Sequence, residues 1–450
     1  MLSKPVMYWF DAGSGGEGDL GAYLDGSPGD RNIHIFLICV GLAVLLRRRI
    51  NWSAVFREYR VVWLFYAYAA LSVSWSYYPL VSLKRVIREL GSVLMLLIII
   101  TDSHGLEAVR RVFVRCAVVL LPLSVLFIKY YPDIGRYYHR WTYQVQYAGV
   151  TTNKNSLGAL AMLGGLFLLW HLAESWKGQT FSQRVAAVGP EAGVLLLCLW
   201  LLRIADSATA LGCFILGSVL FVVGRHLLAG RSVKWTAGLL TAVGLAGWLV
   251  LWSSDLRGWV AQSLGRDTTL TTRTDIWAAV LGLRTDPLFG VGFASVWLTP
   301  KGWALSQRLS IPHAHSGYLE TYLNTGMVGV ALLIAVLLLA VKQAARHLSA
   351  RTSVGAFFAA VVLTGVVYNF TEAAFNNGHA VGLVLWLIAL CSPELASVRQ
   401  NGQLTPLERK PKWLNRAGPG PRKRGATVLS PRPTAHNAHS DTQRCVDYSD

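Results

Sequence analysis

The sequence predicts an all-α, polytopic helical membrane protein with about 11 transmembrane helices. Of its 450 residues, 53% are hydrophobic and only 15% are charged. The mean hydropathy of +0.41 is too high for an ordinary soluble enzyme. Apolar runs of helical length recur along the chain, and a helix satisfies its own backbone groups inside a bilayer. These three observations favour one membrane bundle over several soluble domains.

The apolar runs define the helices in order. Candidate spans are predicted at residues 33–46, 61–76, 90–103, 112–130, 156–173, 191–205, 208–224, 236–254, 326–341, 354–370 and 380–393. Several are shorter than the roughly 20 residues that a bilayer requires, so the count holds to within about one or two helices.

The formal net charge of +18 has a membrane explanation. Basic residues gather in alternate loops, as the positive-inside rule requires of cytoplasmic loops. They are Arg47, Arg48, Arg49, Arg57, Arg60, Arg110, Arg111, Lys177, Arg184, Arg225, Arg231, Lys234, Lys342, Arg346 and Arg351. This pattern fits membrane orientation better than nucleic-acid binding. It places residues 131–155, the short turn near Asp206 and Ser207, and residues 255–325 and 371–379 on the opposite, extracytoplasmic side.

The chain divides into three parts. Residues 1–32 form a polar N-terminal segment, and residues 33–393 form the membrane domain with a large loop at about 255–325. Residues 394–450 are basic and rich in proline, which predicts a disordered cytoplasmic tail. The six cysteines are scattered without metal-ligand spacing, so neither a disulfide framework nor a zinc site is indicated.

The segment 255–325 is much the longest connection, and long connections tend to be functional or disordered. Its aromatic residues among Gly and Pro turns favour a packed substructure with amphipathic helices lying on the membrane. They are Trp259, Trp277, Phe289, Phe293 and Trp297.

A histidine segment at residues 313–326 lies where this loop ends and an apolar run resumes at Met327. A histidine there is next to water yet anchored to a helix, and its ordinary pKa near 6.5 suits proton transfer at neutral pH. His315 is the candidate general base. The alternative is that it only caps or packs against a helix start, and His313 stays unassigned.

Basic residues on the extracytoplasmic side need a reason. One is an anionic ligand, because guanidinium groups match phosphate oxygens, and the other is attraction to anionic lipid headgroups. Arg273 follows a hydroxyl-rich stretch that begins at Arg266. Arg203 lies inside or at the end of an apolar run, where a charge marks function, snorkelling or a pair with Asp206.

Two further positions have a binding and a structural interpretation. Lys154, between Asn153 and Asn155, either contacts a ligand or belongs to a helix cap. Glu372 is either an interfacial carboxylate or an ion-pair partner.

Residues 315–326 resemble the histidine motif of the O-antigen ligase and polymerase superfamily. Within it, the chain is most similar to ExoQ-type exopolysaccharide polymerases. Supporting stretches lie at residues 152–158, 206–211, 266–277 and 286–293, in the family's order.

The resemblance implies a GT-C-like glycosyltransferase of the bacterial inner membrane, active on the periplasmic side without a metal ion or other cofactor. Its substrate would be a polyprenyl-diphosphate-linked oligosaccharide. It implies His315 as the base that activates the acceptor hydroxyl and Arg273 as a diphosphate ligand, with Arg266 and Lys154 as further substrate-binding candidates. Ligases carry a second arginine directly after a serine, but here Ala208 follows Ser207, and Arg203, one turn earlier, is the candidate substitute.

The family usually begins with another apolar helix before its first polar loop. Its absence here means either that the N-terminus is extracytoplasmic or that the given start misses a span.

The expected function is therefore polymerisation of lipid-linked repeat units into exopolysaccharide. The first alternative is a ligase that transfers finished glycan to a lipid or protein acceptor. The second is a transporter or flippase, which the lack of an inverted repeat and of many ionisable residues in mid-span disfavours. Candidate partners are membrane lipids, a chain-length regulator and export proteins.

Overall fold

The computed structural model describes residues 28–48, 50–102, 104–138, 143–175, 181–252, 273–311, 313–352, 354–375 and 379–392. The chain divides into two units, residues 1–401 and 402–450, and all described residues belong to the first. The predicted tail and Arg266 therefore lie outside the described residues. So does most of the predicted N-terminal segment.

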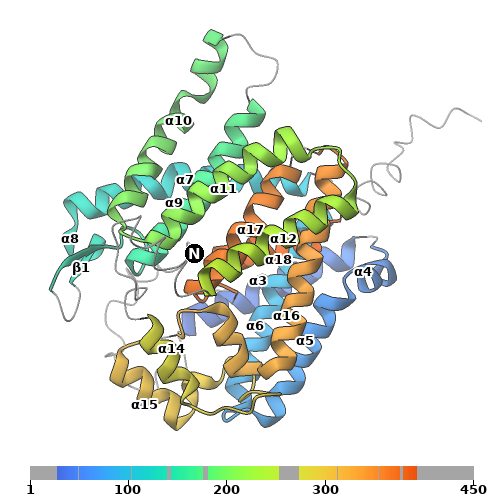
Figure 1. Ribbon diagram of the computed structural model, residues 1–450, viewed down its shortest axis with the longest axis vertical. Helices are drawn as coiled ribbons and strands as arrows, with labels where there is room; N and C mark the ends of the chain where they lie inside the picture. The colour runs from blue at the N-terminus through green and yellow to red at the C-terminus, as the bar shows by residue number, and fades with distance from the viewer. Residues whose placement is uncertain are drawn as a thin grey trace, which may run out of the picture. The chain divides into compact units, whose positions relative to one another are not determined.

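The described chain is almost entirely helical (Figure 1). Its longer helices are α3 (Pro28–Arg47), α5 (Arg60–Leu71), α6 (Pro79–Ile100), α7 (Gly105–Tyr130), α9 (Lys154–Ser175), α10 (Phe181–Ile204), α11 (Ala208–Val223), α12 (Val233–Trp252), α16 (Gly317–Ser349), α17 (Gly355–Thr371) and α18 (Ala380–Leu390). Short helices are α4 (Trp52–Glu58), α8 (Pro132–Gly135), α14 (Arg273–Leu281) and α15 (Pro300–Leu309), with 3-10 turns η1 (Ser72–Trp75) and η3 (Val296–Leu298) and a π-helical turn η2 (Gly224–Leu228). Strands β1 (Arg136–Tyr138) and β2 (Val145–Tyr147) form an antiparallel hairpin.

The predicted fold class, a helical polytopic membrane protein, is confirmed. Each of the predicted apolar runs coincides with one of the longer helices. Among the described residues, four helices are long and apolar enough to cross a membrane: Gly105–Tyr130, Lys154–Ser175, Ala208–Leu228 and Gly317–Ser349. Others, such as α17 and α18, are apolar but shorter. Exposed side chains such as Ile215, Val219 and Val222 on α11 form the kind of surface that faces lipid.

Several helices begin earlier than their apolar runs. Helix α6 begins at Pro79 rather than near residue 90, because its first turns carry charged side chains that hydropathy counts against a span. Proline suits the first helical position because its fixed φ angle is helical. The N–H group that proline lacks would have had no partner at the helix start. Helix α7 likewise begins at Gly105, ahead of the predicted residue 112.

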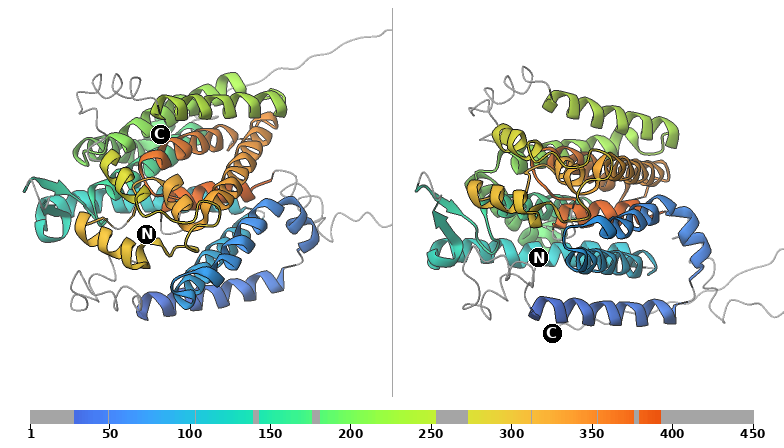
Figure 2. Two further views of the ribbon diagram at one scale, coloured as in Figure 1. Left: turned by 60° about the horizontal axis from the view of Figure 1, so that its bottom comes forward. Right: turned by 90° about the horizontal axis from the view of Figure 1, so that it is seen from below.

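Two groups of helices build the membrane bundle. Helix α16 packs against α17, α12, α18 and α5, while α9 packs against α7, α10 and α11 (Figures 1 and 2). Small residues allow the close approach: a Cβ at Gly158 of α9 would lie 2.8 Å from the Ala210 Cβ of α11. This contact brings the N-terminal ends of α9 and α11 together.

The described part of the long loop, residues 273–311 and 313–316, packs into a substructure. It contains α14, η3 and α15, and it has a hydrophobic core of its own. Val280, Trp297, Leu305 and Ile311 form this core together with Leu323 of α16. The loop is thereby fixed to the start of α16, where the histidine segment lies.

Candidate functional site

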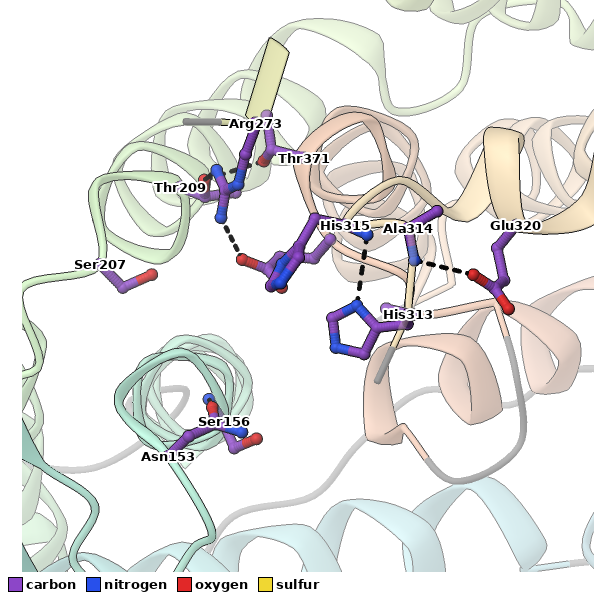
Figure 3. A network of polar contacts seen from close by, with 12 residues as sticks. Asn153, Ser156, Ser207, Thr209, Arg273, His313, Ala314, His315, Glu320 and Thr371 are labelled. Atoms are coloured by element: carbon purple, nitrogen blue, oxygen red, sulfur yellow. Dashed lines mark hydrogen bonds and ion pairs between the residues drawn. The ribbon is translucent and has the colours of Figure 1, made fainter. Parts of the chain in front are cut away.

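Helix starts converge at one end of the bundle. Figure 3 shows Asn153 and Ser156 at the start of α9, and Ser207 and Thr209 at the start of α11, on the side that faces Arg273 and His315. Asn153 accepts a hydrogen bond from the Ser156 amide (2.9 Å), and Ser207 accepts one from the Ala210 amide (3.5 Å). Because helix N-termini carry partial positive charge and free N–H groups, this end of the bundle favours an anion.

Arg273, the first residue of α14, reaches two other helices. Its Nη2 forms an ion pair with Glu372 at the end of α17, and its Nη1 donates to the Thr209 hydroxyl of α11 (3.4 Å). The side chain of Glu372 is only 7% exposed and that of Arg273 13% exposed, so the pair is largely withdrawn from solvent. Thr209 also hydrogen-bonds Thr371 (2.8 Å), which joins α11 to α17.

His315 lies beside this ion pair. Its Nδ1 is 3.8 Å from Oε2 of Glu372, which is longer than a hydrogen bond, and Nδ1 is buried without a hydrogen-bond partner. The contact is therefore electrostatic rather than a hydrogen bond. Its backbone is in the left-handed region, with φ of +48°, and its amide donates to Nδ1 of His313 (3.3 Å). Such a conformation is uncommon for a non-glycine residue and clusters at functional sites.

The charges fix the ionisation of Glu372. Burial alone would raise its pKa, but the neighbouring imidazole of His315 and the guanidinium of Arg273 together hold the pKa below its ordinary value. Burial, together with the field of His315, lowers the pKa of His313 to about 4. Glu372 is therefore anionic and His313 neutral at neutral pH.

Glu320, in the first turn of α16, holds the histidine segment in place. Its buried carboxylate accepts hydrogen bonds from the Ala314 amide (2.9 Å), the Trp297 indole (2.8 Å) and the Asn324 side chain (3.3 Å). Ala314 lies between the two histidines (Figure 3). Three donors on one carboxylate thus connect the loop, the histidine segment and α16.

The other predicted ligands lie differently. Lys154 begins α9 and lies 3.5 Å from the Asp206 carboxylate, while its neighbour Asn153 has the capping role. Asp206 thus contacts Lys154, and the exposed side chain of Arg203 makes no hydrogen bond or ion pair with another described residue. Arg266 lies outside the described residues, as stated above. Within the described chain, no three His, Cys, Asp or Glu side chains form a group suited to a metal ion.

Two site residues were not assigned from the sequence. The sequence offers Glu372 as an interfacial carboxylate or an ion-pair partner, and nothing in the sequence says which arginine reaches this carboxylate across 99 positions. Glu320 was not singled out at all. Its spacing of five residues from His315 gives no signal, since the contact depends on how the loop folds back onto α16.

Two comparisons with known proteins concern the family that this chain resembles. Residues 192–334 match the O-antigen ligase family model, a range that includes Arg203, Arg273 and His315. The chain is a helical membrane protein that is similar to the O-antigen ligase family over these residues, so the resemblance identified in the sequence is confirmed. Over 302 residues the chain is 26% identical to the exopolysaccharide production protein ExoQ of Rhizobium meliloti (strain 1021). The match covers 63% of this chain and 65% of ExoQ, slightly less than two thirds of that relative.

Proposed function

We propose that this protein is a membrane glycosyltransferase that polymerises polyprenyl-diphosphate-linked repeat units into exopolysaccharide. The meeting of Arg273, Glu372 and His315 in one largely buried cluster carries this proposal. It unites an anion ligand with a titratable base, the two functions that glycosyl transfer from a diphosphate requires. The similarity to an exopolysaccharide production protein supports the choice of product.

The leaving group is bound by positive charge in this scheme. Arg273 directs one nitrogen to Glu372 and another to Thr209, and a guanidinium has five N–H donors, so further donors remain for diphosphate oxygens. The starts of α9 and α11, with Lys154, add a favourable field. Arg203 and Arg266 remain candidates for a second arginine ligand.

His315 acts as the base. The carboxylate of Glu372 faces its Nδ1 and favours the tautomer with the proton there, which leaves Nε2 to accept a proton. The acceptor hydroxyl oxygen bonds the anomeric carbon of the donor while the bond from that carbon to the diphosphate oxygen breaks. The electron pair leaves with the diphosphate, and the hydroxyl proton passes to His315.

The charge pattern of the loops supports a periplasmic location for this site. Helix α9 starts at the site. Near its other end, Glu174 of α9 pairs with Arg225 (3.0 Å), and Arg225 belongs to the basic connection that follows α11. Basic connections are predicted to be cytoplasmic. The candidate site belongs to the opposite end, where the glycan would be elongated in the periplasm of a bacterial inner membrane.

A ligase is the second candidate, and the family match described as O-antigen ligase favours it. A ligase would use the same cluster but transfer finished glycan to a lipid or protein acceptor. The two activities differ in what accumulates when the protein is removed. A polymerase works alongside a chain-length regulator and export proteins, which we propose as partners.

The decisive experiment is mass analysis of lipid-linked oligosaccharides and secreted glycan in a deletion strain. Accumulation of single repeat units on the carrier lipid is the result expected for a polymerase. Long chains that remain unattached would show a ligase instead. Normal glycan of normal length would contradict both.

A further inference from the structure

Helices α3 and α6 run side by side in the same direction at the edge of the bundle (Figure 2, right). A Cβ at Gly91 of α6 would lie 2.8 Å from the Ile38 side chain of α3, and Gly41 lies against Leu94 and Met95. Their C-terminal ends are joined as well, because Arg48 donates to the Ile98 carbonyl (2.6 Å). The register between the two helices is therefore fixed.

This register brings three cations together. Arg31 lies seven residues before Ile38, and Lys84 lies seven residues before Gly91. Seven residues make about two helical turns, so Arg31 and Lys84 lie at the same level on the facing sides of α3 and α6. Arg88 is one turn further along α6. All three side chains are exposed, and none makes an ion pair or hydrogen bond through its side chain with another described residue.

The surface around these cations is apolar. Leu80 and Ile87 of α6 are 75% and 50% exposed, and Phe36 of α3 is 66% exposed. In a membrane protein such a surface faces lipid, where charged side chains are rare and need a partner. Like charges at one level of two packed helices also repel each other. An anion between them would remove both costs.

The contacts at the two ends of α6 show at which end of the bundle the cations lie. Arg85, on the inner side of this helix, donates to the Ala294 carbonyl in the long loop. The other end of α6 contacts Arg48, next to the basic loop. The cations thus belong to the same end of the bundle as His315. They do not contact the Arg273 network, which is built on α11, α14, α16 and α17.

We infer that Arg31, Lys84 and Arg88 form a binding site for the phosphate of an anionic glycerophospholipid, which bridges α3 and α6. Two guanidinium groups and one ammonium group provide donors for the phosphate oxygens. The acyl chains cover the exposed leucine, isoleucine and phenylalanine side chains. A resident membrane lipid is favoured over the glycosyl donor because the site lies on the outer surface and has no contact with the catalytic cluster.

The test uses the full-length protein in lipid nanodiscs and the variant Arg31→Gln/Lys84→Gln/Arg88→Gln. Thermal unfolding is measured in phosphatidylcholine alone and with phosphatidylglycerol added. We expect phosphatidylglycerol to raise the unfolding temperature of the parent protein and not that of the variant. In native mass spectrometry, the triple glutamine variant should bind phosphatidylglycerol about a hundredfold more weakly than the parent, since each basic residue contributes about fivefold to the affinity.

A matched control removes the same charge elsewhere. The variant Arg47→Gln/Arg57→Gln/Arg60→Gln changes three exposed arginines near the opposite end and should keep the shift at the α3–α6 site. The variant Arg31→Lys/Arg88→Lys retains the positive charge of the site and should also show the rise in unfolding temperature with phosphatidylglycerol. In phosphatidylcholine alone, the triple glutamine variant should be at least as stable as the parent, because the repulsion is gone.

Two results would overturn the inference. One is an unchanged phosphatidylglycerol shift in the triple glutamine variant. The other is loss of polyprenyl-diphosphate binding by the triple glutamine variant, which would make these cations a donor site. Neither result depends on the proposed glycosyltransferase activity, since the measurement is lipid binding alone.

Discussion

At the residue scale, Glu372 links the two predicted functional groups, because its carboxylate contacts both Arg273 and His315. Glu372→Gln keeps the shape of the side chain but removes the charge. Arg273 then lacks a counter-ion and His315 lacks the group that orients it. We expect glycan synthesis to fall about a hundredfold or more, the usual contribution of a positioned base.

The control for this variant is Asp275→Asn, which neutralises an exposed carboxylate on the same helix as Arg273. It should leave synthesis within about twofold of wild type, as surface changes usually do. Glycan is quantified in a deletion strain that expresses each variant at equal protein level. Wild-type synthesis by Glu372→Gln would show that the carboxylate has no role in the reaction.

Glu320 is predicted to be important for stability. Glu320→Gln has one acceptor oxygen fewer and places an amide against N–H donors, so at least one of the donors from Ala314, Trp297 and Asn324 loses its partner. A buried donor without a partner costs about 1–3 kcal/mol. Thermal unfolding in detergent measures this loss.

The comparison variant is Glu107→Gln. Its carboxylate pairs with Arg110 and Arg111 near the surface, where an ion pair is worth at most about 1 kcal/mol. If the two variants unfold at the same temperature, the role assigned to Glu320 is incorrect.

Acidification should destabilise the protein through two histidines. Burial lowers the pKa of His313 and of His379 to about 4, below the ordinary 6.5. Between these values the unfolded chain binds protons that the folded chain does not, so stability falls as the pH is lowered from 6.5 toward 4. The unfolding temperature should be lower at pH 5 than at pH 7. The drop in unfolding temperature from pH 7 to pH 5 should be smaller in His313→Gln than in the parent protein. An equal drop in both proteins would contradict the role of His313 in the acid sensitivity.

At the element scale, the start of α16 depends on one glycine. Gly326 has φ of +64° and ψ of −166° inside the helix, and a Cβ there would collide with the Leu288 carbonyl. The kink lets Met327 donate to the Pro287 carbonyl (2.9 Å), which holds the long loop against α16. This backbone region is essentially limited to glycine.

Gly326→Ala is therefore expected to destabilise the protein by about 3 kcal/mol or more, as strain of this kind and a steric overlap add. Gly212→Ala is the matched control, since nothing lies within 4 Å of its Cβ position on α11. Alanine favours a helix, so this variant should be as stable as the parent or slightly more stable. Thermal unfolding of the two variants in parallel checks the prediction, which fails if they behave alike.

The sequence predicts the helices well and the connections poorly. Apolar runs locate every long helix because the bilayer imposes length and hydropathy together. Helix α4 and the β1–β2 hairpin were not predicted, since short amphipathic or aromatic segments give no such signal. The charged first turns of α6 were likewise excluded from its predicted range.

The candidate site shows the same limit. His315 and Arg273 could be selected from the sequence because they lie in a motif or a hydroxyl-rich stretch. Their common partner Glu372 follows a different helix, and only the packing of α11, α16 and α17 brings the three together. Contacts between residues far apart in the chain depend on this packing and leave no trace in local composition.

At the scale of the whole molecule, the charge asymmetry predicts which end faces the periplasm. Asp206 is exposed near the site, and Arg231 is exposed in a basic connection at the other end. A membrane-impermeant maleimide should label Asp206→Cys from the periplasm. Arg231→Cys should react only after the inner membrane is opened. The reverse pattern would place the site in the cytoplasm, and the parent chain serves as the blank for its own cysteines.

The most direct test of the account concerns His315. His315→Ala is expressed in the deletion strain at wild-type protein level, and its lipid-linked oligosaccharides are analysed by mass. The account predicts that single repeat units accumulate on the carrier and that polymer is lost. Wild-type polymer from His315→Ala would contradict the assignment of His315 as the base and, with it, the proposed mechanism.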